Sequence, residues 1–141
     1  MPGIQFFQDH ISIRFPQIRK TKAWLHEAAL SQKSTISDLN YIFTDDQHLQ
    51  VLNYRFLKHD ALTDILTFDR SENSNLIEGD IYISYERVRE NSKTYRQPLR
   101  DELHRVMIHG LLHLLGLRDG SPAEKEEMRK LENHYLALRS W

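Results

Sequence analysis

The most informative stretch of the sequence runs from residue 106 to residue 119 and reads Val-Met-Ile-His-Gly-Leu-Leu-His-Leu-Leu-Gly-Leu-Arg-Asp. It belongs to a predicted helix over 99–116 whose second half is apolar on nearly every side, a pattern typical of a central, buried helix. His109 and His113 interrupt the apolar run. Because residues four apart share one face of a helix, the two imidazole rings can converge on one cation.

A third ligand is available just beyond the histidine pair. Gly116 permits the left-handed turn that ends a helix, and the chain can then turn back to bring Asp119 near the rings. Two imidazoles and a carboxylate, with a fourth position left for water, make up a catalytic zinc site. We therefore predict a metallohydrolase with His109, His113 and Asp119 as metal ligands and one Zn²⁺ ion, or another divalent metal, as cofactor.

Each of these residues also has an ordinary interpretation. A lone histidine in a helix is usually a packing or surface residue, and Asp119 can be a solvated turn residue before the next helix. The paired histidines fit this interpretation less well, because each neutral imidazole carries a donor and an acceptor that burial must satisfy.

Length and composition indicate one ordinary globular domain spanning 1–141. The 141 residues are 40% hydrophobic and 28% charged, and 19 basic residues face 20 acidic ones, so a nucleic-acid partner would need a local basic patch. The absence of cysteine excludes disulfides and thiolate ligands. No signal peptide is visible, and the longest apolar stretch, 106–117, is too short to span a bilayer. We expect a cytoplasmic protein with no membrane partner.

The rest of the sequence alternates strand and helix signals. Ile11, Ile13 and Phe15 alternate with polar residues, which predicts a strand over 11–15. The other predicted elements are a helix over 17–31, a strand over 38–44, a helix over 46–57 capped by Asp45, strands over 64–69 and 79–84, helices over 85–96 and 99–116, and a last helix that begins with a Ser121–Glu124 capping box and ends near Trp141. The order β-α-β-α-β-β-α-α-α predicts an α/β (α+β) fold: a single layered domain with a small mixed four-stranded sheet packed with about five helices, and the metal site on a central buried helix.

The general base of a zinc peptidase is missing. Metzincin peptidases share the His-x-x-x-His-x-x-Gly spacing but carry a glutamate directly after the first histidine, where this chain has Gly110. Glu102 lies on the same face, but seven residues correspond to about 10 Å of helix rise, too far for direct catalysis. We interpret Glu102 as a supporting or surface carboxylate. The missing glutamate argues against an ordinary protease.

Several segments match one family together. Residues 109–116 read His-Gly-Leu-Leu-His-Leu-Leu-Gly and match the motif His-Gly-x-Leu-His-Leu-x-Gly-Tyr-Asp-His. Other matches are Asn53 with Asp60, Thr63, Asp64, Leu66 and Phe68, then Gly79-Asp80-Ile81 with Ile83-Ser84, and Glu126-Glu127-Met128. On these residues, over 38–138, the chain resembles the YbeY family of bacterial metallo-endoribonucleases.

The chain departs from the family pattern at identifiable positions. Asp119 stands where the family usually has its third metal-binding histidine, and its negative charge makes the metal a weaker Lewis acid. A family arginine aligns with Leu57, so that Lys58 or His59 is a candidate for its phosphate-facing role. Leu62 replaces the usual proline.

The resemblance implies a single-strand-specific, zinc-dependent endoribonuclease that hydrolyses phosphodiester bonds. It further implies action in ribosomal RNA maturation, at the 3′ end of 16S rRNA, and in ribosome quality control, with single-stranded rRNA and a ribosomal subunit as partners. Beyond the metal-bound water, the candidate catalytic residues are Lys58, His59 and Arg105. The oligomeric state stays open, with a monomer as one option.

Other residues have two readings. The basic series Arg87, Arg89, Lys93, Arg96 and Arg100 either contacts phosphates or forms an ordinary solvated face. Tyr54, Phe56 and Tyr82 are candidates for base stacking, although Phe56 suits the core better. Asp64 and Asp80 either belong to the site or tie strands together.

Two other functions remain as alternatives. One is a metalloprotease-like or other metal-dependent hydrolase, which shares the metal ligands but not the glutamate. The other is a non-catalytic ribosome assembly factor with a structural metal, which requires a fourth protein ligand. Asp101, His104 and His134 are the candidates for that ligand, and none is well spaced.

Overall fold

The protein is described by a computed structural model that covers residues 3–57, 64–73 and 75–141. Four strands form one mixed sheet in the order β1-β2-β4-β3. β1 (Gly3–Gln8), β2 (Thr35–Thr44) and β4 (Leu76–Ser84) are parallel, and β3 (Ile65–Asp69) pairs antiparallel with β4. The described residues also form five helices: α1 (Ile18–Ser31), α2 (Asp46–Leu57), α3 (Tyr85–Thr94), α4 (Leu99–Leu114) and α5 (Pro122–Ala137). The predicted single α+β domain is confirmed.

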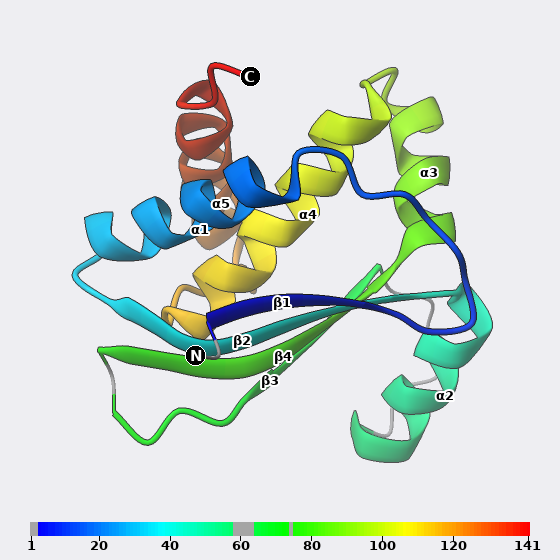
Figure 1. The fold of residues 1–141 in the computed structure, drawn as a ribbon, viewed down its shortest axis with the longest axis horizontal. Helices are drawn as coiled ribbons and strands as arrows, with labels where there is room; N and C mark the ends of the chain where they lie inside the picture. Colours follow the sequence, from blue (N-terminus) through cyan, green and yellow to red (C-terminus); the bar gives the residue numbers. More distant parts are fainter. Residues whose placement is uncertain (1–2, 58–63, 74) are drawn as a thin grey trace.

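Helix α4 lies at the centre of the helical layer, as its apolar sequence predicts. In Figure 1 it passes over the sheet between α1 and α5 on one side and α3 on the other, while α2 lies apart, near the β3 edge. Met107, Ile108, Leu111 and Leu112 are fully buried in the main core cluster. The two histidines predicted to bind metal therefore project from a deeply buried helix.

Gly110 lets α4 approach the sheet closely. A Cβ atom built at this position would lie 2.8 Å from Cδ1 of Ile65 on β3 and 3.0 Å from two carbons of Ile81 on β4. The residue next to His109 therefore faces the sheet core, where no larger side chain fits without displacing its neighbours.

The predicted strand over 11–15 is wrong, because the first strand is Gly3–Gln8 and residues 11–15 have no regular secondary structure. His10 has a φ of 64°, which turns the chain away from the sheet. The side chain of Gln8 then donates to the carbonyl of Ile13 at 2.8 Å and accepts from its amide at 3.0 Å. A side chain thus satisfies backbone groups that a strand partner would otherwise bind, while Ile11, Ile13 and Phe15 still pack on the core.

The helix signals were more reliable. Asp45 accepts a hydrogen bond from the amide of His48 at 2.7 Å and caps α2, and the Ser121–Glu124 capping box opens α5 with Pro122 in its first turn. One burial prediction fails: Phe56 is 58% exposed and touches Phe68 edge-on instead of entering the core.

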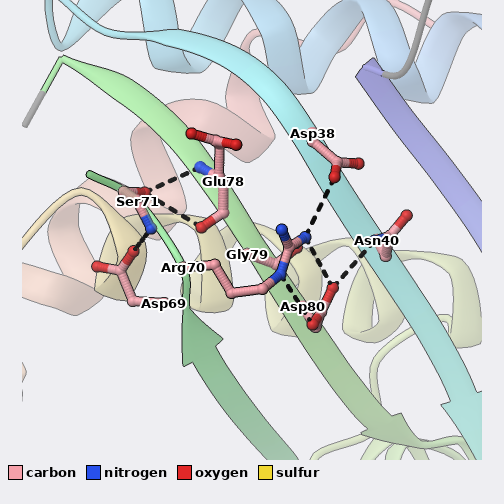
Figure 2. A network of polar contacts seen from close by, with 8 residues as sticks. All are labelled: Asp38, Asn40, Asp69, Arg70, Ser71, Glu78, Gly79 and Asp80. Atoms are coloured by element: carbon pink, nitrogen blue, oxygen red, sulfur yellow. Dashed lines mark hydrogen bonds and ion pairs between the residues drawn. The ribbon is translucent and has the colours of Figure 1, made fainter. Parts of the chain in front are cut away.

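A polar network ties three strands together on the face of the sheet that α4 does not cover. Figure 2 shows the guanidinium of Arg70, just after β3, between Asp38 on β2 and Asp80 on β4, with N–O distances of 3.3 and 3.1 Å. Asn40 also donates to Asp80 at 2.9 Å. Of the two readings of Asp80, strand tying is the one the structure bears out.

Candidate metal centre

The three predicted ligands lie together at the end of α4. His109 Nε2 and His113 Nε2 are 3.0 Å apart, and Asp119 Oδ2 lies 3.3 Å from the first and 3.4 Å from the second. Gly116 makes this possible with a φ of 97°, because its left-handed turn ends the helix and redirects the chain. The amide of Leu117 donates to the carbonyl of Leu112 at 3.1 Å and closes that turn.

The hydrogen bonds of the other ring nitrogens fix how the two rings present themselves. His109 Nδ1 lies 2.6 Å from Glu132 Oε2, and His113 Nδ1 lies 3.1 Å from the carbonyl oxygen of Leu117. A carboxylate and a carbonyl only accept, so each Nδ1 donates its proton. In the neutral rings both Nε2 atoms then carry lone pairs, and these face the carboxylate of Asp119.

Three acceptor atoms in mutual contact repel one another unless a cation lies among them. Zinc binds histidine nitrogen at about 2.0 Å, which places the ligand atoms of a tetrahedral site about 3.3 Å apart. The observed distances of 3.0, 3.3 and 3.4 Å agree with that spacing. The donor set and its geometry therefore fit a divalent metal ion.

Glu132 on α5 is a functional residue that sequence reasoning missed. Its carboxylate is buried and accepts from His109 and from Arg105, the latter at 2.9 Å. Burial alone would raise the pKa of the Glu132 carboxyl. The hydrogen bonds and charges of His109 and Arg105 outweigh burial, so the pKa of Glu132 lies below its usual value. A signal existed in the sequence: Glu132 shares the inward face of its helix with Met128 and Tyr135, where a carboxylate needs partners.

The charge of Glu132 acts on His109 in return. Burial alone lowers the pKa of His109, whereas the hydrogen bond and charge of Glu132, with the charges of Asp119 and Asp64, raise it overall. The same negative surroundings favour a bound cation. This ring–carboxylate pair is the usual way in which proteins orient a metal-binding histidine.

Arg105, one of the candidate catalytic residues, lies beside the site, but its guanidinium is bound to two residues of α5. It contacts Glu132 and also Asn133 Oδ1 at 2.6 Å, so it holds the carboxylate that orients His109. Lys58 and His59 lie outside the described residues, as do Asp60, Leu62 and Thr63.

A cavity of about 540 Å³ adjoins His109. Asp64, which precedes β3, and Glu102 both line it, so Asp64 belongs to the site region. Burial raises the pKa of Asp64, with the charge of His109 acting against the rise. None of the five basic residues of the 87–100 series lines this cavity, and Arg87 instead pairs with Asp46 at 2.9 Å.

The described residues offer no fourth protein ligand in this cluster. His104 is buried against Trp24 and Arg139, Asp101 pairs with Arg139, and His134 is exposed beside Tyr135. A metal ion held by three protein ligands keeps an open position, as catalytic sites do and closed structural sites do not.

A second histidine–carboxylate group comprises Asp9, His10 and His48. His48 Nε2 lies 3.0 Å and His10 Nε2 3.5 Å from different oxygens of Asp9. No described residue fixes the Nδ1 atom of either ring, so ordinary hydrogen bonds to the carboxylate explain this group. The cluster around His109 is the better metal site.

An α+β domain with two helical histidines, a nearby aspartate and an open coordination position is the arrangement of a small metal-dependent hydrolase. Comparison with known proteins gives the particular family. A family model described as Endoribonuclease YbeY matches residues 4–139, and the chain belongs to that family. The predicted family and hydrolase class are thereby confirmed.

Individual relatives cover nearly the whole chain. Endoribonuclease YbeY of Cytophaga hutchinsonii is 45% identical over 98% of this chain and 96% of its own length. The protein of the same name from Amoebophilus asiaticus is 42% identical over 95% of this chain and 91% of its own length. The solution structure of TM1509 from Thermotoga maritima aligns with a TM-score of 0.67 at 26% identity, covering 94% of this chain and 86% of that one.

Within the described part of the chain, no helix combines the length and the apolar character needed to cross a membrane.

Proposed function

We propose that this protein is a single-strand-specific endoribonuclease that hydrolyses RNA phosphodiester bonds with one Zn²⁺ ion held by His109, His113 and Asp119. Its substrate is ribosomal RNA, at the 3′ end of 16S rRNA, and it acts in the cytoplasm with a ribosomal subunit in rRNA maturation and ribosome quality control. Membership of the Endoribonuclease YbeY family supports the activity. The convergence of three acceptor atoms within 3.4 Å supports the metal.

The chain's own residues prepare the site. Glu132 holds the proton of His109 Nδ1, so the Nε2 lone pair is available, and Arg105 holds Glu132 in place. The carbonyl of Leu117 does the same for His113. When bound, the ion supplies a Lewis acid for the scissile phosphate and lowers the pKa of water at the open position.

The protease alternative finds no support at Gly110, where a zinc peptidase carries its glutamate. A glutamate after His109 would have to project where the side chains of Ile65 and Ile81 already lie within 3.0 Å of a Cβ atom. The peptidase base is therefore excluded by packing as well as by sequence. The assembly-factor alternative needs a fourth ligand, which the described residues do not bring to the cluster.

The test is cleavage by zinc-loaded protein of single-stranded RNA, double-stranded RNA and casein. We expect cleavage of single-stranded RNA alone, lost on chelation and in His113→Ala. The matched control is His134→Ala, which removes an exposed histidine of α5 and should cleave like the wild type. RNA cleavage that persists in His113→Ala, or metal-dependent cleavage of casein, would overturn the proposal.

A further inference from the structure

The cavity beside His109 is larger than a metal-bound water requires. Its volume of about 540 Å³ lies within the range of small-molecule sites. Its walls come from α3, α4, α5 and the residue before β3, and His109 forms one side. A group bound there would be adjacent to the reacting phosphate.

Glu102 on α4 is a largely buried residue that lines this cavity. Its relative exposure is 7%, and no described residue donates a hydrogen bond to its side chain. Burial raises the pKa of Glu102, the charge of Arg105 acts against the rise, and the charge of Asp64 adds to it. A carboxylate that lines a cavity and has no protein donor can accept from a ligand that brings N–H groups.

The rim of the cavity has different chemistry. Arg129 on α5 is exposed and forms no ion pair with the described residues, so its guanidinium is available for a phosphate. Tyr95, at the end of α3, is 62% exposed and also lines the cavity, so its ring offers a stacking surface. The Arg129 guanidinium can bind the phosphate of a nucleotide, and the Tyr95 ring can stack on its base. The Glu102 carboxylate can accept from the N–H groups at the edge of that base.

We propose that this cavity binds the base of the nucleotide next to the scissile phosphate and that Glu102 selects guanine. The inference rests on the proposed endoribonuclease function and adds a base specificity to it. Guanine presents two adjacent donors, N1–H and the 2-amino group, to one carboxylate. Adenine and cytosine present a single amino group, and uracil flanks its one N–H with two carbonyl oxygens that a carboxylate repels.

Mononucleotide binding tests the pocket without requiring cleavage. Zinc-loaded protein is titrated calorimetrically with the 5′-monophosphates of guanosine, inosine and uridine. Inosine lacks only the 2-amino group, so it tests the carboxylate in the wild-type protein. We expect guanosine monophosphate to bind about tenfold tighter than uridine monophosphate, with inosine monophosphate between them.

Two variants assign the preference to one side chain. Glu102→Gln should lose most of the preference for guanosine monophosphate and keep its affinity for uridine monophosphate, because an amide cannot accept both donors. Glu90→Gln, an exposed glutamate of α3 outside the cavity, should bind like the wild type. Equal affinities for the three nucleotides, or an unchanged guanosine preference in Glu102→Gln, would overturn the inference.

Cleavage of oligonucleotides that carry a single guanosine or inosine among uridines separates this inference from the proposed function. Metal-dependent cleavage with no preference for guanosine overturns the base pocket and leaves the nuclease intact. Binding of guanosine monophosphate through Glu102 without any RNA cleavage overturns the nuclease and leaves the pocket.

Discussion

The support of His109 depends on one residue of another helix. Glu132 is 23 positions from His109 in the sequence, and the 2.6 Å contact between them exists only because α5 packs on α4. Helical spacing brings His109 and His113 together within one element, so the sequence was sufficient to pair them. It was insufficient to name Glu132, because the register between two helices is a property of the packed core.

Replacing Glu132 should weaken metal binding without removing a ligand. Glu132→Gln keeps the shape but loses the charge that favours the orientation of His109, and such changes cost about 10- to 100-fold in metal affinity. Competition with a chromophoric chelator measures the affinity. Glu127→Gln, an exposed glutamate on the same helix, should leave it unchanged. Equal affinity in the two variants would show that the carboxylate does not act on the metal site.

Asp119 is the proposed third metal ligand, and two substitutions test it. Asp119→Ala removes the third ligand and should lower zinc affinity at least about tenfold, whereas Asp119→His should retain one tightly bound ion per chain, because imidazole is an equally good zinc ligand. Zinc content after dialysis, measured by atomic emission, checks both. Full retention of zinc by Asp119→Ala would exclude this carboxylate as a ligand.

His104 gives the protein a pH-dependent stability away from the metal. Burial, then the charges of Arg139 and Arg100, lowers its pKa to about 3 from 6.5, with Asp101 acting in the opposite direction. Since Arg139 only donates, His104 Nδ1 accepts from it at 2.7 Å and the ring stays neutral in the folded protein. The unfolded chain takes up the proton first, so the folded state loses stability as the pH falls below 6.5 towards 3.

The size of this effect can be measured against a variant that does not titrate. His104→Asn keeps an acceptor near Arg139 and removes the ionisable group. Between pH 6.5 and 4.5, we expect the wild type to lose on the order of 2 kcal/mol more unfolding free energy than His104→Asn. Urea unfolding of chelator-treated protein at several pH values tests this. Parallel pH profiles would contradict it.

At the scale of elements, the sequence predicted the five helices of the described residues, and side-chain caps mark the beginning of α2, α3 and α5. The strand predicted over 11–15 was wrong, because its alternating apolar residues pack on the core without forming a strand. The apolar pattern indicates which side chains are buried. The Gln8 side chain binds both backbone groups of Ile13, so these groups do not pair with a strand. Period-two burial therefore predicts a position in the core more securely than a strand.

The close approach of α4 to the sheet makes Gly110 sensitive to substitution. Gly110→Ala places a methyl group 2.8 Å from Ile65 Cδ1 and should destabilise the fold by about 1–3 kcal/mol, despite the gain in helix propensity. Gly120→Ala is the matched control, because its Cβ meets only Glu124 Oε1 at 3.6 Å. Chemical denaturation compares the two. Equal stability of both variants would mean that the helix can shift away from the sheet at little cost.

At the scale of the whole molecule, metal binding and folding are linked. The proposed ligands lie on the central helix and the turn after it, so an ion that binds the folded arrangement would stabilise the entire domain. With free zinc at a hundred times its dissociation constant, the added stability is about 2.7 kcal/mol. Chelation should therefore lower the thermal midpoint of the wild type and leave that of His113→Ala unchanged. A wild-type midpoint indifferent to chelation would contradict this coupling.

The order of the site residues along the chain also separates zinc binding from the orientation of His109. All three proposed ligands fall within residues 109–119, so a partly folded or truncated chain that retains this segment still has all three candidate ligand side chains. Glu132 belongs to α5, which follows this segment in the sequence. Zinc capture and the alignment of His109 are consequently distinct: a chain shortened before α5 keeps the means to collect the ion but not the carboxylate that orients it.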